Sequence, residues 1–203
     1  MTTVVVGGHA KKVGKTSVVA SLIAAFPEYS WTAIKISPHE HGINLNAAKE
    51  HSRAGEEHTY SILEERKRDG NSDTSRFLAA GASRSLWVCV RPGQLESAMP
   101  RLLPIIRSDP YVIIESNAIL RFIRPDLYIM VLRFDIEDFK DSARELLRQA
   151  DAAVVVNSGS IQPAWKEIPR EAWASIQLFP TTDPGIVPKG LLDLMRSRLH
   201  AGK

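Results

Sequence analysis

The sequence contains a single cysteine, Cys89, so no disulfide can form within the chain. This favours a reducing compartment such as the cytoplasm. No apolar run approaches the roughly 20 residues that cross a membrane, and the apolar run at the N-terminus is too short for a signal peptide. Internal repeats and low-complexity segments are also lacking. We therefore expect a cytoplasmic protein with no membrane partner.

The chain also lacks a strong excess of either charge, because 26 basic residues face 23 acidic ones and the net charge is +3. A charge this small does not indicate nucleic acid as a partner. The length of 203 residues and the hydrophobic fraction of 44% suit one globular domain with a buried core. We expect residues 1–203 to form that single domain.

The strongest motif lies near the N-terminus. The apolar residues 4–6 are followed by two glycines, a basic loop, and then Gly14, Lys15 and Thr16, which open an apolar segment able to form a helix. A strand, a glycine loop and a helix in this order form a cradle for a triphosphate, because loop amides and the positive end of the helix face one anion. The predicted nucleotide-binding residues are Gly8, His9, Ala10, Lys11, Lys12, Val13, Gly14, Lys15, Thr16 and Ser17.

Within this loop, Lys15 is predicted to bind the β- and γ-phosphates as a catalytic residue, and the Thr16 hydroxyl to bind Mg²⁺. The alternative is a lysine-rich loop that caps a helix. The spacing differs from G-x-x-x-x-G-K-[ST], because His9 stands five positions before Gly14 and the glycine is Gly8. The longer loop still meets the physical requirement, since Gly14 allows close approach of the backbone.

This longer loop, with its Val-Gly-Lys-Thr ending, resembles that of dethiobiotin synthetase. More broadly, it resembles the dimerising SIMIBI branch of P-loop proteins, which includes the molybdopterin-guanine dinucleotide biosynthesis protein B family and nickel-insertion GTPases. The resemblance implies a homodimer. In part of that branch a loop lysine contacts phosphate across the dimer interface. Ala10 occupies its position here, and Lys11 and Lys12 are the nearby candidates.

A second signal is the apolar run at residues 111–114, which ends in Glu115. An acid at the end of a buried strand orients Mg²⁺ and can take part in catalysis. The alternative is a strand that ends in a solvated acid. The strand resembles those of dethiobiotin synthetase and the protein B family, where glycine usually follows the glutamate. Here Ser116 and Asn117 follow, so we expect the substrate to differ.

A third signal is the segment 73–82, in which Asp73 suits a helix N-cap and Gly81 a helix end. Asp73, Arg76 three residues later and the Ala-Gly-Ala ending resemble the molybdopterin-guanine dinucleotide biosynthesis protein B family. A functional reading makes Asp73 a ligand of Mg²⁺ or of its water, and Arg76 a phosphate contact. The alternative is a plain capped helix.

The predicted strand at 151–158 is relevant to which nucleotide base the protein selects. It includes Asn157, where nucleotide hydrolases of this branch begin the Asn-Lys-x-Asp motif that reads guanine. Ser158, Gly159 and Ser160 replace the rest. The acceptor for the guanine N1–H and 2-amino group is therefore missing, so both ATP and GTP stay open. We predict that Asn157 contacts the nucleotide, with a simple turn residue as the alternative.

Residues 39–71 are predicted to be a polar insertion, either a lid or partner-binding segment or a loop without function. His39 and His41, with Glu40 between them, are candidate metal ligands, with an exposed polar loop as the alternative. Lys35 stands at the end of the second predicted strand.

Predicted strands near residues 4, 32, 87, 113, 129 and 154 alternate with helices. This order predicts an α/β fold with three layers, α/β/α, and a mostly parallel sheet, as in P-loop nucleoside triphosphate hydrolases. Ligands bind at the carboxyl ends of such strands, where Lys15, Thr16 and Glu115 should meet.

Three functions fit these signals. The first is Mg²⁺-dependent ATP or GTP binding and hydrolysis, resembling the protein B accessory family, which implies a protein partner in molybdenum cofactor assembly. The second is a small-molecule kinase or ligase resembling dethiobiotin synthetase. The third is a nucleotide-gated adaptor or metallochaperone with little turnover.

Overall fold

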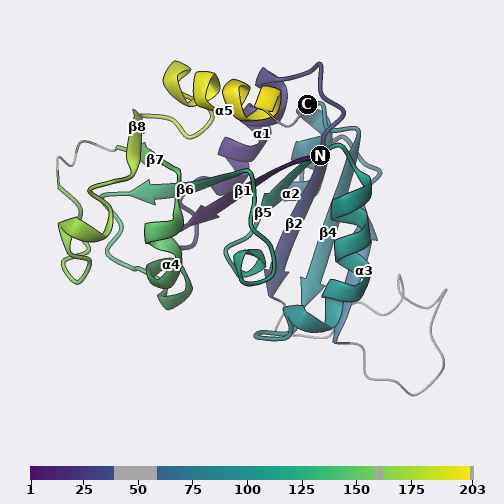
Figure 1. The fold of residues 1–203 in the computed structure, drawn as a ribbon, viewed down its shortest axis with the longest axis horizontal. Helices are drawn as coiled ribbons and strands as arrows, with labels where there is room; N and C mark the ends of the chain where they lie inside the picture. The colour runs from purple at the N-terminus through teal and green to yellow at the C-terminus, as the bar shows by residue number, and fades with distance from the viewer. Residues whose placement is uncertain (39–58, 158, 160–161, 202–203) are drawn as a thin grey trace.

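The computed structural model describes residues 1–38, 59–157, 159 and 162–201, which build an α/β domain (Figure 1). One eight-stranded sheet has the order β3-β4-β2-β5-β1-β6-β7-β8. Its strands are β1 (Thr2–Gly8), β2 (Thr32–Pro38), β3 (Tyr60–Glu64), β4 (Arg84–Val90), β5 (Tyr111–Glu115), β6 (Leu127–Arg133), β7 (Ala152–Val156) and β8 (Gln177–Thr181). All neighbours pair in parallel except β3 with β4. The predicted mostly parallel sheet is confirmed.

Helices cover both faces of the sheet. They are α1 (Lys15–Ala25), α2 (Asp73–Ala79), α3 (Leu95–Ser108), α4 (Asp141–Leu146) and α5 (Lys189–Ala201), with short 3-10 turns η1 (Ala118–Arg121), η2 (Leu147–Gln149) and η3 (Arg170–Ala172). The buried side chains of α1, α2 and α5 belong to one hydrophobic cluster, and those of α3 and α4 to another. The three-layer prediction is confirmed.

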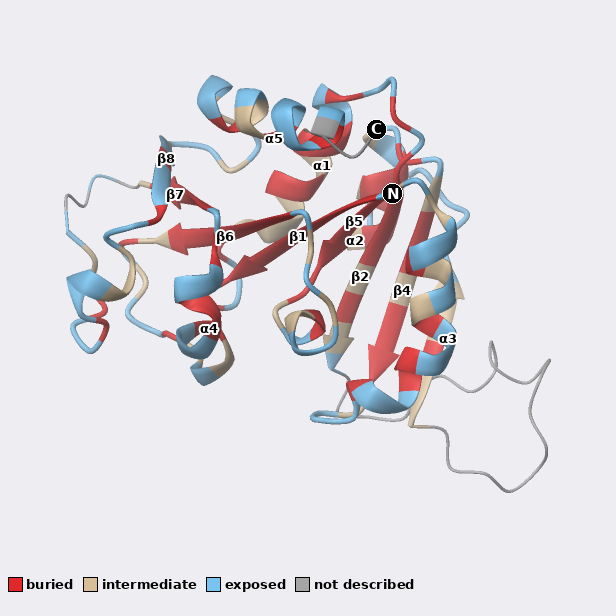
Figure 2. Cartoon of the chain, in the orientation of Figure 1, coloured by how far each residue is buried: buried red, intermediate tan, exposed pale blue. Residues whose placement is uncertain are grey.

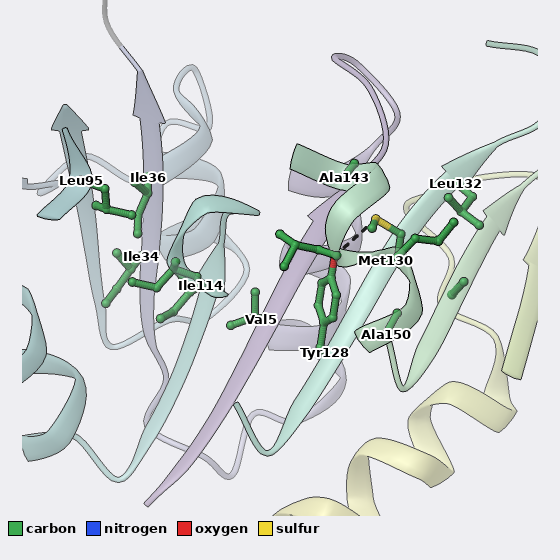
Figure 3. Packing of buried hydrophobic residues seen from close by; sticks show 14 of the residues in the cluster. Val5, Ile34, Ile36, Leu95, Ile114, Tyr128, Met130, Leu132, Ala143 and Ala150 are labelled. Atoms are coloured by element: carbon green, nitrogen blue, oxygen red, sulfur yellow. Dashed lines mark hydrogen bonds between the residues drawn. The ribbon is translucent and has the colours of Figure 1, made fainter. Parts of the chain in front are cut away.

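The alternation along β1 explains the two clusters. Val4 and Val6 belong to the first cluster and Val5 to the second, because successive strand residues point to opposite faces. The inner strands are buried on both faces, while the edge strand β8 and the outer sides of the helices are largely exposed (Figure 2). Figure 3 shows the second cluster, in which the Tyr128 hydroxyl donates a hydrogen bond to the Met130 sulfur at 3.6 Å.

The central position of β1 places the glycine loop. β1 lies between β5 and β6, with Val6 opposite Glu115 and Gly8 opposite Val131. The chain leaves β1 toward β2 on the β5 side and later fills the β6 side. Crevices for ligands form at such a switch in strand order, beyond the carboxyl ends of the strands.

The sequence also predicts helices over 94–106 and 138–149. The first is confirmed as α3, which continues through Pro100 and Pro104, both exposed on its outer side. The second is shorter than predicted, because it is divided into α4 and η2. Sequence reasoning missed β3, which lies within the predicted insertion 39–71.

Residues 39–58 are outside the described residues, and with them His39 and His41. In the part of the chain that is described, no helix combines the length and the apolar character needed to cross a membrane.

Candidate functional site

The loop between β1 and α1 has the backbone of an anion-binding site. Lys12 and Gly14 both adopt left-handed conformations, with φ of 58° and 102°. The amides of residues 10–17 donate no hydrogen bond to any described residue, whereas the Val18 amide donates to the Gly14 carbonyl at 3.0 Å. Left-handed turns that leave successive amides free form concave nests for anions. The loop therefore has donors available for phosphate oxygens.

The Lys15 side chain folds back over this loop. Its Nζ donates to the Ala10 carbonyl at 3.1 Å. Burial lowers the pKa of Lys15 to about 8, although the charge of Glu115 opposes this change. A buried ammonium with a single carbonyl partner is poorly compensated, so an anion bound in the loop would stabilise it.

Thr16, Glu115, Lys35 and Asp73 form one polar network beside the loop. The Thr16 hydroxyl donates to Glu115 Oε2 at 2.9 Å. The Lys35 ammonium lies 2.5 Å from Glu115 Oε1 and 2.9 Å from Asp73 Oδ2. Glu115 is only 2% exposed, so its charge requires such partners. The structure thus brings together the hydroxyl and both carboxylates that the sequence predicted for Mg²⁺.

The pKa values within the network follow from these contacts. Burial acts to lower the pKa of Lys35, but the charge and hydrogen bond of Glu115 outweigh it and the pKa is raised. Burial acts to raise the pKa of Asp73, but its interactions with Lys35 and Thr16 hold the pKa below its usual value. Lys35 therefore stays charged between two acids, as the cation that balances them.

The donor set of the network suits Mg²⁺. Magnesium prefers oxygen ligands and usually keeps waters and substrate phosphate oxygens in its shell. Thr16 supplies a hydroxyl, and Glu115 and Asp73 supply carboxylates. The described residues contain no group of three or more His, Cys, Asp or Glu side chains placed to hold a metal by themselves. The network therefore fits an ion that a nucleotide helps to coordinate.

Asn117 fastens the start of the loop to the strand beside it. Its Oδ1 accepts the Gly8 amide at 2.9 Å, and its Nδ2 donates to the Gly8 carbonyl at 3.0 Å. A Cβ at Gly7 would stand 2.4 Å from Asn117 Oδ1, which explains glycine there. The residues that follow Glu115 in place of the usual glycine thus have a structural role, because Asn117 holds the start of the phosphate loop. Ser116 likewise accepts the Ile119 amide at 3.3 Å.

His9 lies beneath the loop and turns away from the predicted nucleotide. It is fully buried, its Nε2 accepts the Arg133 amide at 3.0 Å, and its Nδ1 lies 2.9 Å from the Asp138 carbonyl. Burial lowers the pKa of His9 to about 4, so the ring is neutral with its proton on Nδ1. His9 therefore anchors the loop to the segment after β6.

Two other predicted residues have partners elsewhere. Arg76 donates to the Ser17 hydroxyl at 3.0 Å and joins α2 to α1. Asn157 Oδ1 accepts the Gly159 amide at 2.8 Å, which is the geometry of the turn residue offered as the alternative.

The loop at 181–186 closes the other end of the site. A Cβ at Gly14 would stand 2.6 Å from the Pro184 side chain, so this loop packs against the phosphate loop. The Ser21 hydroxyl of α1 donates to the Gly185 carbonyl at 2.6 Å. The 181–186 loop is thus joined to both the phosphate loop and α1.

A small open pocket of about 260 Å³ lies beside the polar network. Its lining residues are Lys35, Ser37, Ser72, Asp73, Thr74 and Trp87. The Trp87 indole donates to Ser37 at 2.8 Å. Two of these residues, Lys35 and Asp73, also belong to the network, so the pocket adjoins the predicted phosphate site.

Sequence reasoning missed two connections in this site. Lys35 stands at the end of the predicted second strand, which was a usable signal for its link to Glu115, although β2 itself continues to Pro38. Nothing in the sequence signalled that Asn117 would bind Gly8.

Comparison with known proteins bears on the fold. The structure of HypB from Helicobacter pylori in complex with nickel superimposes with a TM-score of 0.51, covering 98% of this chain and 87% of that chain. The chain has the P-loop NTPase fold. The two sequences are 14% identical, so the likeness extends to the fold alone. No protein-family model matches the chain, and no curated protein matches it in sequence.

Proposed function

We propose that this P-loop NTPase-fold chain binds a nucleoside triphosphate together with Mg²⁺ and hydrolyses it or transfers its γ-phosphate. The observation that carries the proposal is the meeting of Thr16, Glu115 and Lys15 beside a loop of free amides. Glycine loops of this kind bind phosphates through backbone amides, while a lysine neutralises the outer phosphates.

The residues have distinct roles in this proposal. The loop amides and Lys15 bind and orient the phosphates, and Thr16, Glu115 and Asp73 hold the metal directly or through water. When bound, Mg²⁺ neutralises charge on the transferring phosphoryl group. The two Glu115 oxygens accept hydrogen bonds from Thr16 and Lys35, which fix the carboxylate in place. In this proposal a fixed carboxylate positions the ion. Most of the catalytic effect is electrostatic.

We place the chain nearest the molybdopterin-guanine dinucleotide biosynthesis protein B family in the SIMIBI branch. Its support is the sequence resemblance at the loop, at Glu115 and at the segment from Asp73 to Ala82. On this basis we propose a cytoplasmic homodimer that assists cofactor assembly with a protein partner. ATP and GTP are both candidates, because Asn157 has no aspartate after it to read guanine.

Two other candidates have specific support. The pocket beside Lys35 would suit the phosphoryl acceptor of a small-molecule kinase or ligase. The likeness in fold to HypB, whose structure holds nickel, favours a nucleotide-gated metallochaperone. Turnover that rises only with an added small molecule would favour the first. Stoichiometric zinc or nickel uptake that is lost in His39→Ala/His41→Ala would favour the second.

The test of the proposal is a titration of the purified protein with MgATP and MgGTP, together with mass spectrometry of any nucleotide that co-purifies. We expect micromolar or tighter binding, and at least a roughly hundredfold loss in Lys15→Ala. Removing a poorly compensated buried ammonium should not unfold the protein, so the thermal midpoint serves as the control. Equal affinity in Lys15→Ala would overturn the proposed site.

A further inference from the structure

Lys140 is held against the phosphate loop by its backbone. Its amide donates to the His9 carbonyl at 2.9 Å. Two hydrogen bonds of the His9 ring hold the same segment: Nε2 accepts the Arg133 amide, and Nδ1 donates to the Asp138 carbonyl. The start of the Lys140 side chain is therefore fixed next to the loop residue that precedes Ala10, the acceptor of Lys15.

The Lys140 side chain also interacts electrostatically with the charges of the site. It is half-buried, and its ammonium forms no ion pair or hydrogen bond with any described residue. Burial first, and then the charges of Lys11 and Lys35, lower the pKa of Lys140, with Asp138 opposing them. Lys140 in turn lowers the pKa of Lys15.

These lysines leave the site with an excess of positive charge. Three acids lie near these lysines, and two of them, Glu115 and Asp73, are already joined by Lys35, while the third, Asp138, forms no ion pair with Lys140. Lys15 and Lys140 have no such carboxylate partner among the described residues. Like charges gathered in a partly buried place are unfavourable unless an anion joins them.

Local structure offers no reason for a lysine here. Lys140 is the N-cap of α4, where side chains that accept a hydrogen bond are preferred and a cation is disfavoured by the helix dipole. The position therefore costs stability in the protein without a ligand.

We propose that Lys140 binds the outer phosphates of the nucleotide beside Lys15, as a second cation supplied by the same chain. This inference rests on the proposed nucleotide function and assigns one further residue to that site. With Lys140 in this place, the phosphates need no lysine from a second copy of the chain, and neither Lys11 nor Lys12 has to reach across a dimer.

The experiment compares Lys140→Gln with Lys166→Gln, since Lys166 is exposed and on the segment before η3. Both variants lose one charge. Titration with MgATP, MgGTP and magnesium pyrophosphate should show roughly tenfold to hundredfold weaker binding in Lys140→Gln. Lys166→Gln should bind as the unmodified protein does. Adenosine and guanosine, which lack phosphates, should not distinguish the variants, and Lys140→Arg should restore most of the affinity.

A second readout is labelling of lysines by a short pulse of acetic anhydride, followed by mass spectrometry. MgATP or MgGTP should protect Lys140 but not Lys166, and the nucleoside should protect neither. Wild-type affinity in Lys140→Gln, or labelling of Lys140 unchanged by nucleotide, would overturn this inference alone. Failure of the unmodified protein to bind any triphosphate would overturn the proposed function as well.

Discussion

The predicted phosphate end and the predicted base end of the site are built in different ways. At the phosphate end, free amides, Lys15 and the network of Thr16, Glu115 and Lys35 are turned toward one small region. At the other end, the Asn157 side chain accepts a hydrogen bond from its own turn. The Thr181 hydroxyl donates to the carbonyls of Asp183 and Ile186. Polar groups satisfied by their own loop have little left for a ligand. The comparison indicates that free polar groups gather at the predicted phosphate end and not at the predicted base end.

The largest expected effect on this comparison comes from replacing Glu115 at the phosphate end. In Glu115→Gln we expect nucleotide affinity within about threefold of wild type but a loss of Mg²⁺-dependent turnover of roughly hundredfold, because the carboxylate positions the ion in the transition state. The measurement is kcat at saturating MgATP and MgGTP. Glu64→Gln, on the edge strand β3, is a matched control that should keep full activity. Persistent turnover in Glu115→Gln would make Glu115 a strand end only.

The two asparagines sharpen the comparison. Asn117→Ala removes two hydrogen bonds to Gly8 that join segments 109 residues apart, so the free energy of unfolding should fall by about 2 kcal/mol. Asn157→Ala removes one bond within an exposed turn and should cost at most about 0.5 kcal/mol. Denaturant unfolding measures both. Similar losses in the two variants would remove the contrast between the ends.

The smallest expected effect is a pH dependence confined to the phosphate end. The pKa of Lys15, about 8, is below its ordinary value, so the protein without ligand loses this charge as the pH rises through 8. A bound anion favours the charged form, so triphosphate affinity should fall by about tenfold between pH 7 and 9. Calorimetry across that range measures it. Lys15→Arg should flatten the profile, and a falling affinity for the nucleoside alone would contradict the assignment.

Much of the fold was open to prediction because its signals are local. Continuous apolar runs predicted the buried strands, and α1 begins at Lys15 and ends at Ala25 as the apolar pattern and Pro27 indicated. β3 was missed because its short apolar run is interrupted by Ser61, ends in Glu64 and stands in a polar stretch. An edge strand needs only one apolar face, so its signal is weak.

The candidate site was predicted in part. The carboxyl ends of β1 and β5 had to meet once the sheet was parallel, which placed Glu115 beside Thr16. His9 could not be assigned in this way. It was grouped with the nucleotide-binding residues by its place in the loop, yet its ring is packed against Phe139 and Trp165 at centroid distances of 5.0 and 6.0 Å. Which way a loop side chain turns depends on what the rest of the chain places around it.

By itself the sequence determined the order of strand, glycine loop and helix, and the acid that ends a second buried strand, because each depends on residues that are neighbours along the chain. Only the tertiary structure decided that Asn117 fastens Gly8, that His9 is buried and neutral, and that the Lys140 amide donates to the His9 carbonyl. These contacts join residues more than a hundred positions apart. Their geometry exists only after the sheet has assembled and both of its faces are covered.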